Sequence, residues 1–125
     1  MQLVRSADTR RTATPAAVMT TLASPTLGSS PVPLWRVEAA PGTPGPLHLI
    51  DADQVWTFTA GSARVEVGGE AADLAEGDTL VVPAGVARRL TPGAAGFTAV
   101  VTGPAGMRAS MPDAPHETID LAWAA

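Results

Sequence analysis

Three polar side chains and one aromatic ring in the middle of the chain could take part in chemistry: His48, Gln54, Trp56 and Arg88. A histidine, with an ordinary pKa of about 6.5, can accept and release a proton at neutral pH. An arginine can hold a carboxylate or an enolate with paired hydrogen bonds, and a glutamine can orient a polar group as both donor and acceptor. If one cavity gathered these residues, they would suit proton transfer on a small organic anion or carbonyl compound.

The composition excludes several other kinds of chemistry. The 125 residues contain no cysteine, which rules out disulfides, thiolate metal sites and cysteine nucleophiles. The net charge is −4 and the eight basic residues are mostly scattered, so the chain lacks the dense basic face that nucleic acids and anionic membranes require. No secretory signal or membrane-length apolar run is visible. We therefore expect a cytoplasmic protein that binds neither nucleic acid nor membrane.

Short runs of valine, threonine and tryptophan between glycines and prolines predict closely spaced β-strands. The expected strands fall within residues 32–41, 54–61, 62–67, 70–74, 78–82, 87–92 and 97–103, with turns at Gly61 and at Gly68-Gly69. Close strand spacing of this kind favours an all-β fold, a small antiparallel β-barrel of the jelly-roll type. Such a barrel would position the four candidate side chains on inward-facing strand positions.

The chain should form one domain with three parts. Residues 34–103 would make the barrel, and residues 1–33 an N-terminal segment. Within that segment Thr14 and Pro15 favour a short helix over Pro15–Leu22, whereas the overlapping stretch AVMTTLASPTL, residues 17–27, also suits a strand added to a neighbouring subunit. Residues 104–125 would be a tail that docks on the barrel through its apolar side chains, with the stretch HETID on the surface. The docking side chains would be Ile119, Leu121 and Trp123.

The spacing of glycines and prolines resembles the two conserved motifs of the cupin superfamily. The first motif reads G, five residues, HxH, three or four residues, E, six residues, G. The second reads G, five residues, PxG, two residues, H. The matching residues here are Gly42, His48, Ile50, Gln54, Gly61, Gly77, Pro83, Gly85 and Arg88. The resemblance, to small single-domain bacterial cupins, implies a double-stranded β-helix barrel and a homodimer.

The resemblance also implies a metal site of three histidines and one glutamate, and here most of these ligands are replaced. The corresponding positions hold His48, Ile50, Gln54 and Arg88, and the only other histidine, His116, lies in the tail. A fixed positive charge at Arg88 would repel a divalent cation by several kcal/mol in a partly buried cavity. We therefore expect no cofactor; a divalent metal, if one binds, would be held by His48 and Gln54.

The preferred hypothesis is a metal-independent acid–base enzyme that isomerises, cyclises or cleaves a small, biosynthetic organic substrate. In it His48 and Arg88 are catalytic, and the substrate-binding residues are Ile50, Gln54, Trp56 and Phe58. The alternatives are a non-catalytic ligand-binding or sensor protein and a metal-dependent, dioxygenase-like cupin with a degenerate site. Two structural questions stay open at this point. His48 could serve only as a hydrogen-bonding scaffold residue, and a register slip of one residue would turn Arg89 inward in place of Arg88.

Overall fold

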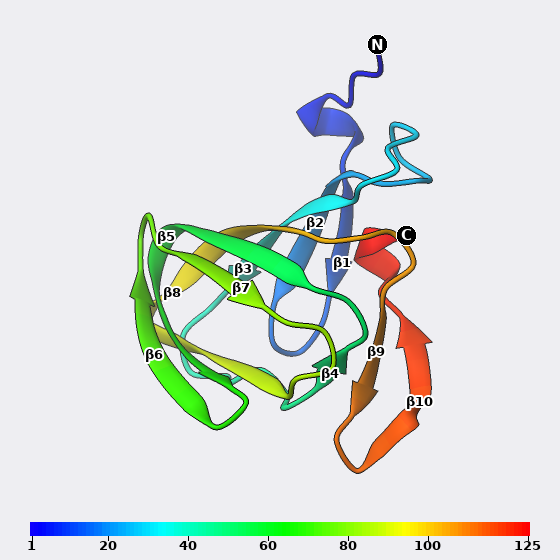
Figure 1. Cartoon of the computed structure of the whole chain (residues 1–125). Helices are drawn as coiled ribbons and strands as arrows, with labels where there is room; N and C mark the ends of the chain where they lie inside the picture. The colour runs from blue at the N-terminus through cyan, green and yellow to red at the C-terminus, as the bar shows by residue number, and fades with distance from the viewer.

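Ten β-strands and two short 3-10 helices make up the computed structural model, which describes residues Met1–Ala125 (Figure 1). The helices are η1 (Ser6–Asp8) and η2 (Ala122–Ala124). The strands are β1 (Arg10–Ala13), β2 (Val18–Ala23), β3 (Leu34–Ala39), β4 (Leu49–Ile50), β5 (Gln54–Val67), β6 (Glu70–Ala75), β7 (Thr79–Val82), β8 (Arg88–Thr102), β9 (Arg108–Met111) and β10 (Ala114–Asp120).

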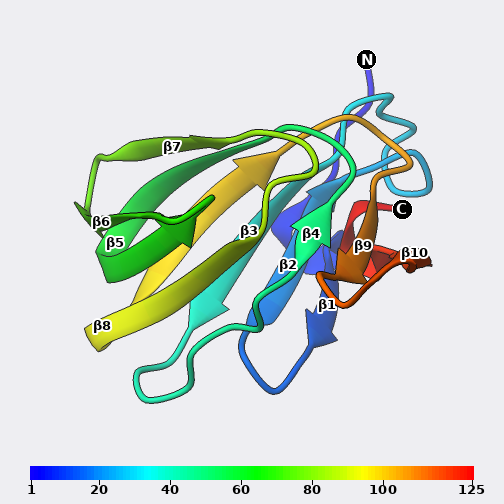
Figure 2. The same ribbon diagram turned by 60° about the horizontal axis from the view of Figure 1, so that its bottom comes forward.

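The strands form two sheets in which every pairing is antiparallel. The larger sheet has the order β1-β2-β3-β8-β5-β6, with β7 also paired to β5, and the smaller one has the order β10-β9-β4. Figures 1 and 2 show the large sheet curving round, with the smaller sheet beside its concave part. The predicted all-β antiparallel fold is therefore confirmed.

The two longest strands, β5 and β8, each join two segments that the sequence predicts as separate strands. Their pairing shifts register on both sides of Gly61, which has a φ of 73°. We expected Gly61 at a hairpin turn, but it lies at an irregularity inside β5, where a Cβ would collide with the carbonyl oxygen of Gly96. An irregularity of this kind bends both strands without ending them, and so lets the sheet curl into a barrel. The Gly68-Gly69 turn between β5 and β6 is confirmed.

The helix expected over Pro15–Leu22 does not form, because this segment turns and then continues as β2. The Thr14 hydroxyl accepts hydrogen bonds from the backbone N–H groups of Ala16 and Ala17, at 3.3 and 3.2 Å, so it stabilises a tight turn between β1 and β2. Pairing with β3 over Val18–Ala23 then outweighs the local helix signal. In this chain β2 pairs with its own β3, and exchange of the strand between subunits stays a prediction.

The C-terminal residues form a hairpin, β9–β10, followed by η2, which packs against β1 and β2. Leu121 is 5% exposed and Trp123 is half-buried, whereas Ile119 is 67% exposed. The segment therefore docks through Leu121 and Trp123 and not through Ile119. Side chains of the N-terminal strands also hold the last residues, since Arg10 and Ser24 donate to the Ala125 carbonyl at 2.8 and 2.7 Å.

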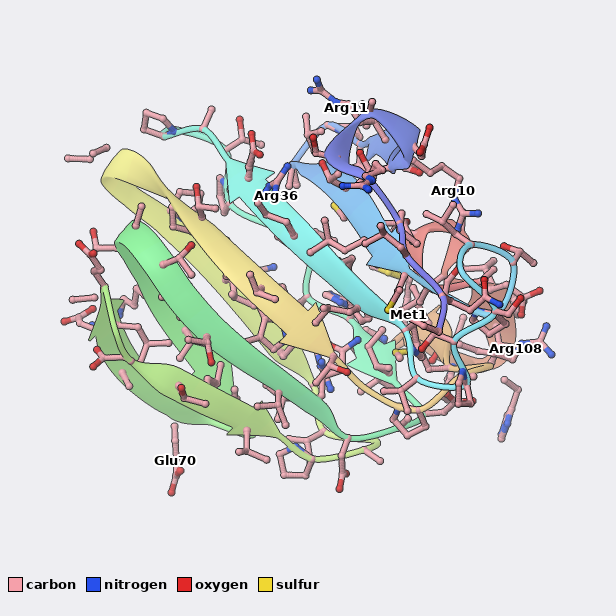
Figure 3. All side chains as sticks on the ribbon, turned by 90° about the horizontal axis from the view of Figure 1, so that it is seen from above. Met1, Arg10, Arg11, Arg36, Glu70 and Arg108 are labelled. Atoms are coloured by element: carbon pink, nitrogen blue, oxygen red, sulfur yellow. The ribbon has the colours of Figure 1, made fainter.

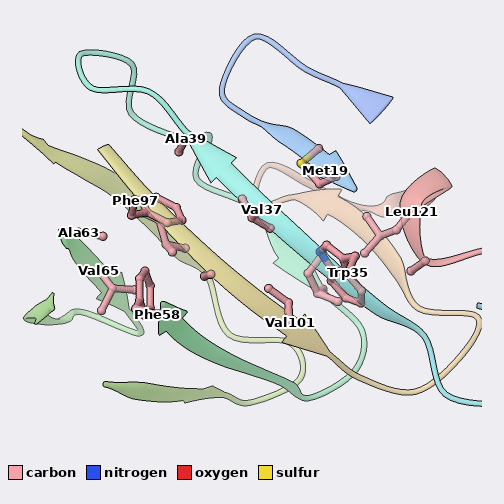
Figure 4. Packing of buried hydrophobic residues seen from close by; sticks show 14 of the residues in the cluster. Met19, Trp35, Val37, Ala39, Phe58, Ala63, Val65, Phe97, Val101 and Leu121 are labelled. Atoms are coloured by element: carbon pink, nitrogen blue, oxygen red, sulfur yellow. The ribbon is translucent and has the colours of Figure 1, made fainter. Parts of the chain in front are cut away.

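The hydrophobic core lies on the concave side of the large sheet. Figure 4 shows side chains from β2, β3, β5 and β8 converging there with Leu121, and Trp35 and Phe58 are almost completely buried. Charged residues such as Arg11, Glu70 and Arg108 lie on the outside (Figure 3). None of the helical segments has the length and apolar character needed to cross a lipid bilayer.

Candidate functional site

A cavity of about 620 Å³ opens on the concave side of the barrel, and most of its lining is apolar. Its walls come from β2 and β3, from the loop through residues 43–46, from β4 and the start of β5, and from the C-terminal hairpin with η2. A volume of this size is typical of sites for small organic molecules. Four of the six residues predicted for the site line this cavity, namely His48, Ile50, Gln54 and Trp56.

The His48 ring is fixed through one of its two nitrogens. Its Nδ1 lies 2.8 Å from the carbonyl oxygen of Pro46. Because a carbonyl can only accept, Nδ1 carries the hydrogen, and Nε2 of the neutral ring is left as a proton acceptor without a protein partner. Burial lowers the pKa of His48 below 6.5; the Pro46 hydrogen bond opposes this shift and the charge of Arg88 adds to it. The side chain is therefore a neutral base at physiological pH.

The backbone of His48 also has a structural role, since it forms an isolated antiparallel bridge to Arg88. The His48 N–H donates to the Arg88 carbonyl at 3.0 Å, and the Arg88 N–H donates back at 2.9 Å. This bridge ties the loop that carries the imidazole to the start of β8. The His48 backbone therefore has a scaffold role, and the ring also hydrogen-bonds a backbone carbonyl, that of Pro46, so the alternative of a purely structural His48 stays open.

Gln54 lies at the polar end of the cavity and is almost completely buried. Its Oε1 accepts two hydrogen bonds, from Arg88 Nη1 at 3.0 Å and from Trp56 Nε1 at 3.2 Å. Its Nε2 lies 3.2 Å from the sulfur of Met107, which is a weak acceptor. Both acceptor positions of the amide oxygen are therefore taken, and the amide is held in one orientation.

The β8 register turns Arg88 inward, so that this side chain is 1% exposed while Arg89 is half-buried. Besides Gln54, its guanidinium contacts the carbonyls of Pro83 and Val86, each at 3.4 Å. It makes no salt bridge with any carboxylate. Arg88 does not line the cavity but lies behind Gln54, so it cannot grip a ligand directly as we expected. Burial lowers its pKa to about 10, a value at which the group is still charged at neutral pH.

Phe58 also lies away from the cavity, contrary to its predicted role as a substrate-binding residue. It shares a face of β5 with Gln54 and Trp56 but is completely buried. Its ring lies 5.2 Å from that of Phe97 and 6.4 Å from that of Trp56, measured between centroids. Phe58 therefore belongs to the core behind the cavity wall, and Trp56 and Ile50 are the neighbouring residues that line the cavity.

Sequence reasoning missed the part of the cavity lining that comes from the C-terminal hairpin. Ser110 and Met111 of β9 and Glu117 and Ile119 of β10 line the cavity. We expected HETID to be simple surface, but Glu117 is both exposed and part of the cavity rim. Glu117 and Ile119 are two residues apart in a strand and so share one face, which was the available signal for a common role. This spacing does not reveal which part of the protein that face contacts.

The side chains at the four metal-ligand positions do not fit a metal ion. They offer one imidazole, one alkyl group, an amide whose oxygen already accepts two hydrogen bonds, and a guanidinium. Zinc and iron sites in proteins need three or four imidazole, thiolate or carboxylate ligands. No group of three or more histidine, aspartate or glutamate side chains lies together anywhere in the structure. Gln54 was predicted from the sequence as a possible metal ligand, but its amide oxygen already accepts a hydrogen bond from Arg88.

Solved structures with similar folds include two enzymes and one protein of unknown function. A tryptophan-to-phenylalanine variant of oxalate decarboxylase from Bacillus subtilis matches 97% of this chain at a TM-score of 0.76 and 19% identity, and the match covers 32% of that enzyme. Salicylate 1,2-dioxygenase from Pseudoaminobacter salicylatoxidans, solved as adducts with gentisate, matches 82% of this chain and 31% of its own at a TM-score of 0.71 and 22% identity. A conserved protein of unknown function from Streptococcus pyogenes matches 70% of this chain and 73% of its own, with a TM-score of 0.60 and 22% identity. The chain therefore spans about a third of the length of the two enzymes.

A comparison with curated proteins gave no match. The family model described as a cupin domain matches residues 35–100, which is more than half of the chain and includes His48, Gln54 and Arg88. The curved antiparallel fold and the similar solved structures agree with that match. The chain therefore belongs to the cupin family.

Proposed function

We propose that this cupin binds a small organic molecule in the apolar cavity and that His48 transfers a proton on it without the help of a metal ion. The observation that carries this proposal is the fixed imidazole. One nitrogen is anchored to the Pro46 carbonyl, and the other is a free base in the wall of a cavity large enough for a substrate. A general base needs this combination of fixed geometry and a pKa near or below the working pH.

Metal independence is part of the proposal, and it is supported by the donor set. Arg88 Nη1 lies 3.0 Å from the Gln54 oxygen, at the place where a metal would need that oxygen as a ligand. A cation bound there would lie close to the guanidinium, and the two positive charges would repel each other. A single imidazole would be left to hold the ion, and one ligand is too few for a structural or a catalytic site.

The proton transfer can be written with the residues present. His48 Nε2 takes a proton from a carbon next to a carbonyl group, the C–H bond breaks, and its electron pair moves into a C=C bond as the carbonyl oxygen becomes an enolate. If the substrate has a second C=C bond conjugated with the enolate, the imidazolium returns the proton to the far carbon of that dienolate and the carbonyl re-forms, which isomerises the substrate. If the β-carbon carries a leaving group, the enolate electrons form a C=C bond between the α- and β-carbons as the carbonyl re-forms and the bond to the leaving group breaks. The imidazolium protonates the departing group, which completes an elimination. Trp56 and Ile50 supply the apolar wall that positions the substrate and excludes water.

Hydrogen–deuterium exchange tests this function before any substrate is known. A panel of small enolisable ketones would be incubated with the protein in deuterated water, and C–H exchange followed by proton NMR. We expect the protein to accelerate exchange for ligands that bind, and we expect His48→Gln to reduce that acceleration about a hundredfold or more. Binding with no acceleration, or acceleration that His48→Gln leaves unchanged, would contradict the proposed proton transfer.

The second candidate is a ligand-binding protein without catalysis. It is favoured by the cavity lining, which places a single imidazole among mostly apolar groups, with its one carboxylate, that of Glu117, at the rim. This candidate predicts that His48→Ala retains most of the ligand affinity and that no bound compound is converted. The exchange assay, combined with a binding measurement on the same variants, separates the two functions.

A further inference from the structure

The buried guanidinium of Arg88 has consequences for the kind of ligand that the cavity accepts. We infer that this ligand is an organic monoanion: an apolar body that fills the cavity, with one acidic oxygen beside the Gln54 amide, in the electric field of Arg88. This inference rests on the proposed binding function and adds the charge of the ligand to it.

The first observation is a positive charge without a counter-charge. Arg88 is 1% exposed, and its contacts are all neutral: one amide oxygen and two backbone carbonyls. The ion pairs of the structure involve other arginines, all on the surface. A buried charge is usually paired with an opposite charge, because desolvation is costly. An anionic ligand would supply the missing charge.

The second observation is that Gln54, which lines the cavity, is hydrogen-bonded to Arg88 and is polarised by it. Arg88 and Trp56 both donate to the amide oxygen, so the N–H side of the amide is polarised as a donor. One N–H points to the sulfur of Met107, which is a weak acceptor, and the other has no acceptor in the protein. Gln54 lines the cavity, so we take the N–H without a protein acceptor as the donor that a ligand oxygen would meet. A negatively charged oxygen makes the strongest hydrogen bond with such a donor.

The third observation concerns the rest of the cavity. The surfaces around this polar end are mostly apolar side chains, including Trp35, Ile50 and Trp123. Glu117, the only carboxylate of the lining, lies at the exposed rim. An anionic group beside Gln54 would accept a hydrogen bond from the amide and would be attracted by the charge of Arg88 behind it. A fully apolar ligand would leave that charge without a counter-charge. The ligand is therefore amphipathic, with its charge at the inner end.

A pair of isosteric probes tests this inference without a known substrate. Naphthoate and naphthamide have the same apolar body and nearly the same shape, but only the first carries a charge at neutral pH. Their affinities would be measured by calorimetry at pH 8. Burial keeps His48 uncharged at this pH, while Arg88 stays protonated. We expect naphthoate to bind at least about tenfold more tightly than naphthamide.

Three variants assign the preference to Arg88. Arg88→Met removes the charge with a side chain of similar length, and it should abolish the preference for naphthoate. Arg89→Met, the matched control, changes the net charge by the same amount at the neighbouring residue and should keep the preference. Arg88→Gln removes the charge but keeps hydrogen-bond donors, and it should also abolish the preference, which allows a conclusion even if Arg88→Met proves too unstable to measure.

The outcomes separate this inference from the proposed function. If naphthamide binds as tightly as naphthoate, the cavity takes organic ligands but the inferred charge is wrong. If naphthoate is preferred and Arg88→Met retains the preference, the charge comes from elsewhere, and the role of Arg88 is wrong. If neither probe binds at millimolar concentration, the cavity is not an organic binding site, and both the inference and the proposed function fail.

Discussion

Replacing Phe58 by alanine tests most directly whether β5 divides into cavity wall and core as the structure shows. The side chain is completely buried, so the substitution removes a whole ring from the core. Loss of a buried phenylalanine costs about 3–5 kcal/mol. The tilted contact with Phe97, at 5.2 Å between centroids, contributes about 1 kcal/mol of this beyond the buried area. We expect Phe58→Ala to lower the free energy of unfolding by about 4 kcal/mol.

The measurement is urea-induced unfolding, followed by circular dichroism, together with the affinity for naphthoate in the absence of urea. Phe58→Ala should leave that affinity nearly unchanged, because Phe58 does not line the cavity. Trp56→Ala is the matched comparison on the same strand. Trp56 is half-buried and lines the cavity, so its loss should cost less stability, about 2 kcal/mol, and weaken naphthoate binding about tenfold or more.

The opposite pattern would refute this reasoning. If Phe58→Ala costs less than about 1 kcal/mol and weakens naphthoate binding as much as Trp56→Ala does, then Phe58 reaches the ligand as the sequence predicted. Should Phe58→Ala unfold completely, Phe58→Leu removes less volume and keeps the comparison possible. Phe58→Leu should lower the free energy of unfolding by less than Phe58→Ala would. It should still leave the naphthoate affinity nearly unchanged, in contrast to Trp56→Ala.

Three other predictions concern pH, backbone and the C-terminus. Because the folded pKa of His48 lies below its ordinary value of 6.5, the unfolded state binds more protons, so stability should fall as the pH drops below about 6.5. His48→Gln should flatten that part of the stability curve measured by urea unfolding between pH 7 and pH 5. Gly61→Ala should cost about 2 kcal/mol or more in the same assay, since its φ is 73° and its Cβ would strike the Gly96 carbonyl; a smaller loss would mean that the strands shift easily. Arg10→Ala removes a hydrogen bond to Ala125 and should speed amide hydrogen exchange in the last residues, measured by NMR, while the core strands keep their protection.

The sequence alone determined most strand positions between residues 34 and 102 and the turn at Gly68-Gly69, because these depend on local chemistry. Gly68-Gly69 has the backbone freedom that a tight turn needs, and Pro83 ends the apolar strand that precedes it. The motif spacing also predicted that His48 and Gln54 share one cavity, and both residues line it in the structure. The sequence could likewise show that one chain cannot supply a three-histidine metal site, since it contains only two histidines.

Tertiary structure decided which residues from distant parts of the chain are in contact, and local sequence patterns carry little information about such contacts. Alternation along β5 gives Gln54, Trp56 and Phe58 the same face, but only core contacts such as that with the Phe97 ring show that Phe58 is completely buried while Trp56 is half-buried. The same is true of the N-terminal segment, where pairing with β3 overrides a local helix signal. It is also true of Glu117, which is 69 residues from His48 in the chain and lines the same cavity. Above all, the β8 register places Arg88 behind Gln54, where it is a buried charge that hydrogen-bonds the amide and does not line the cavity.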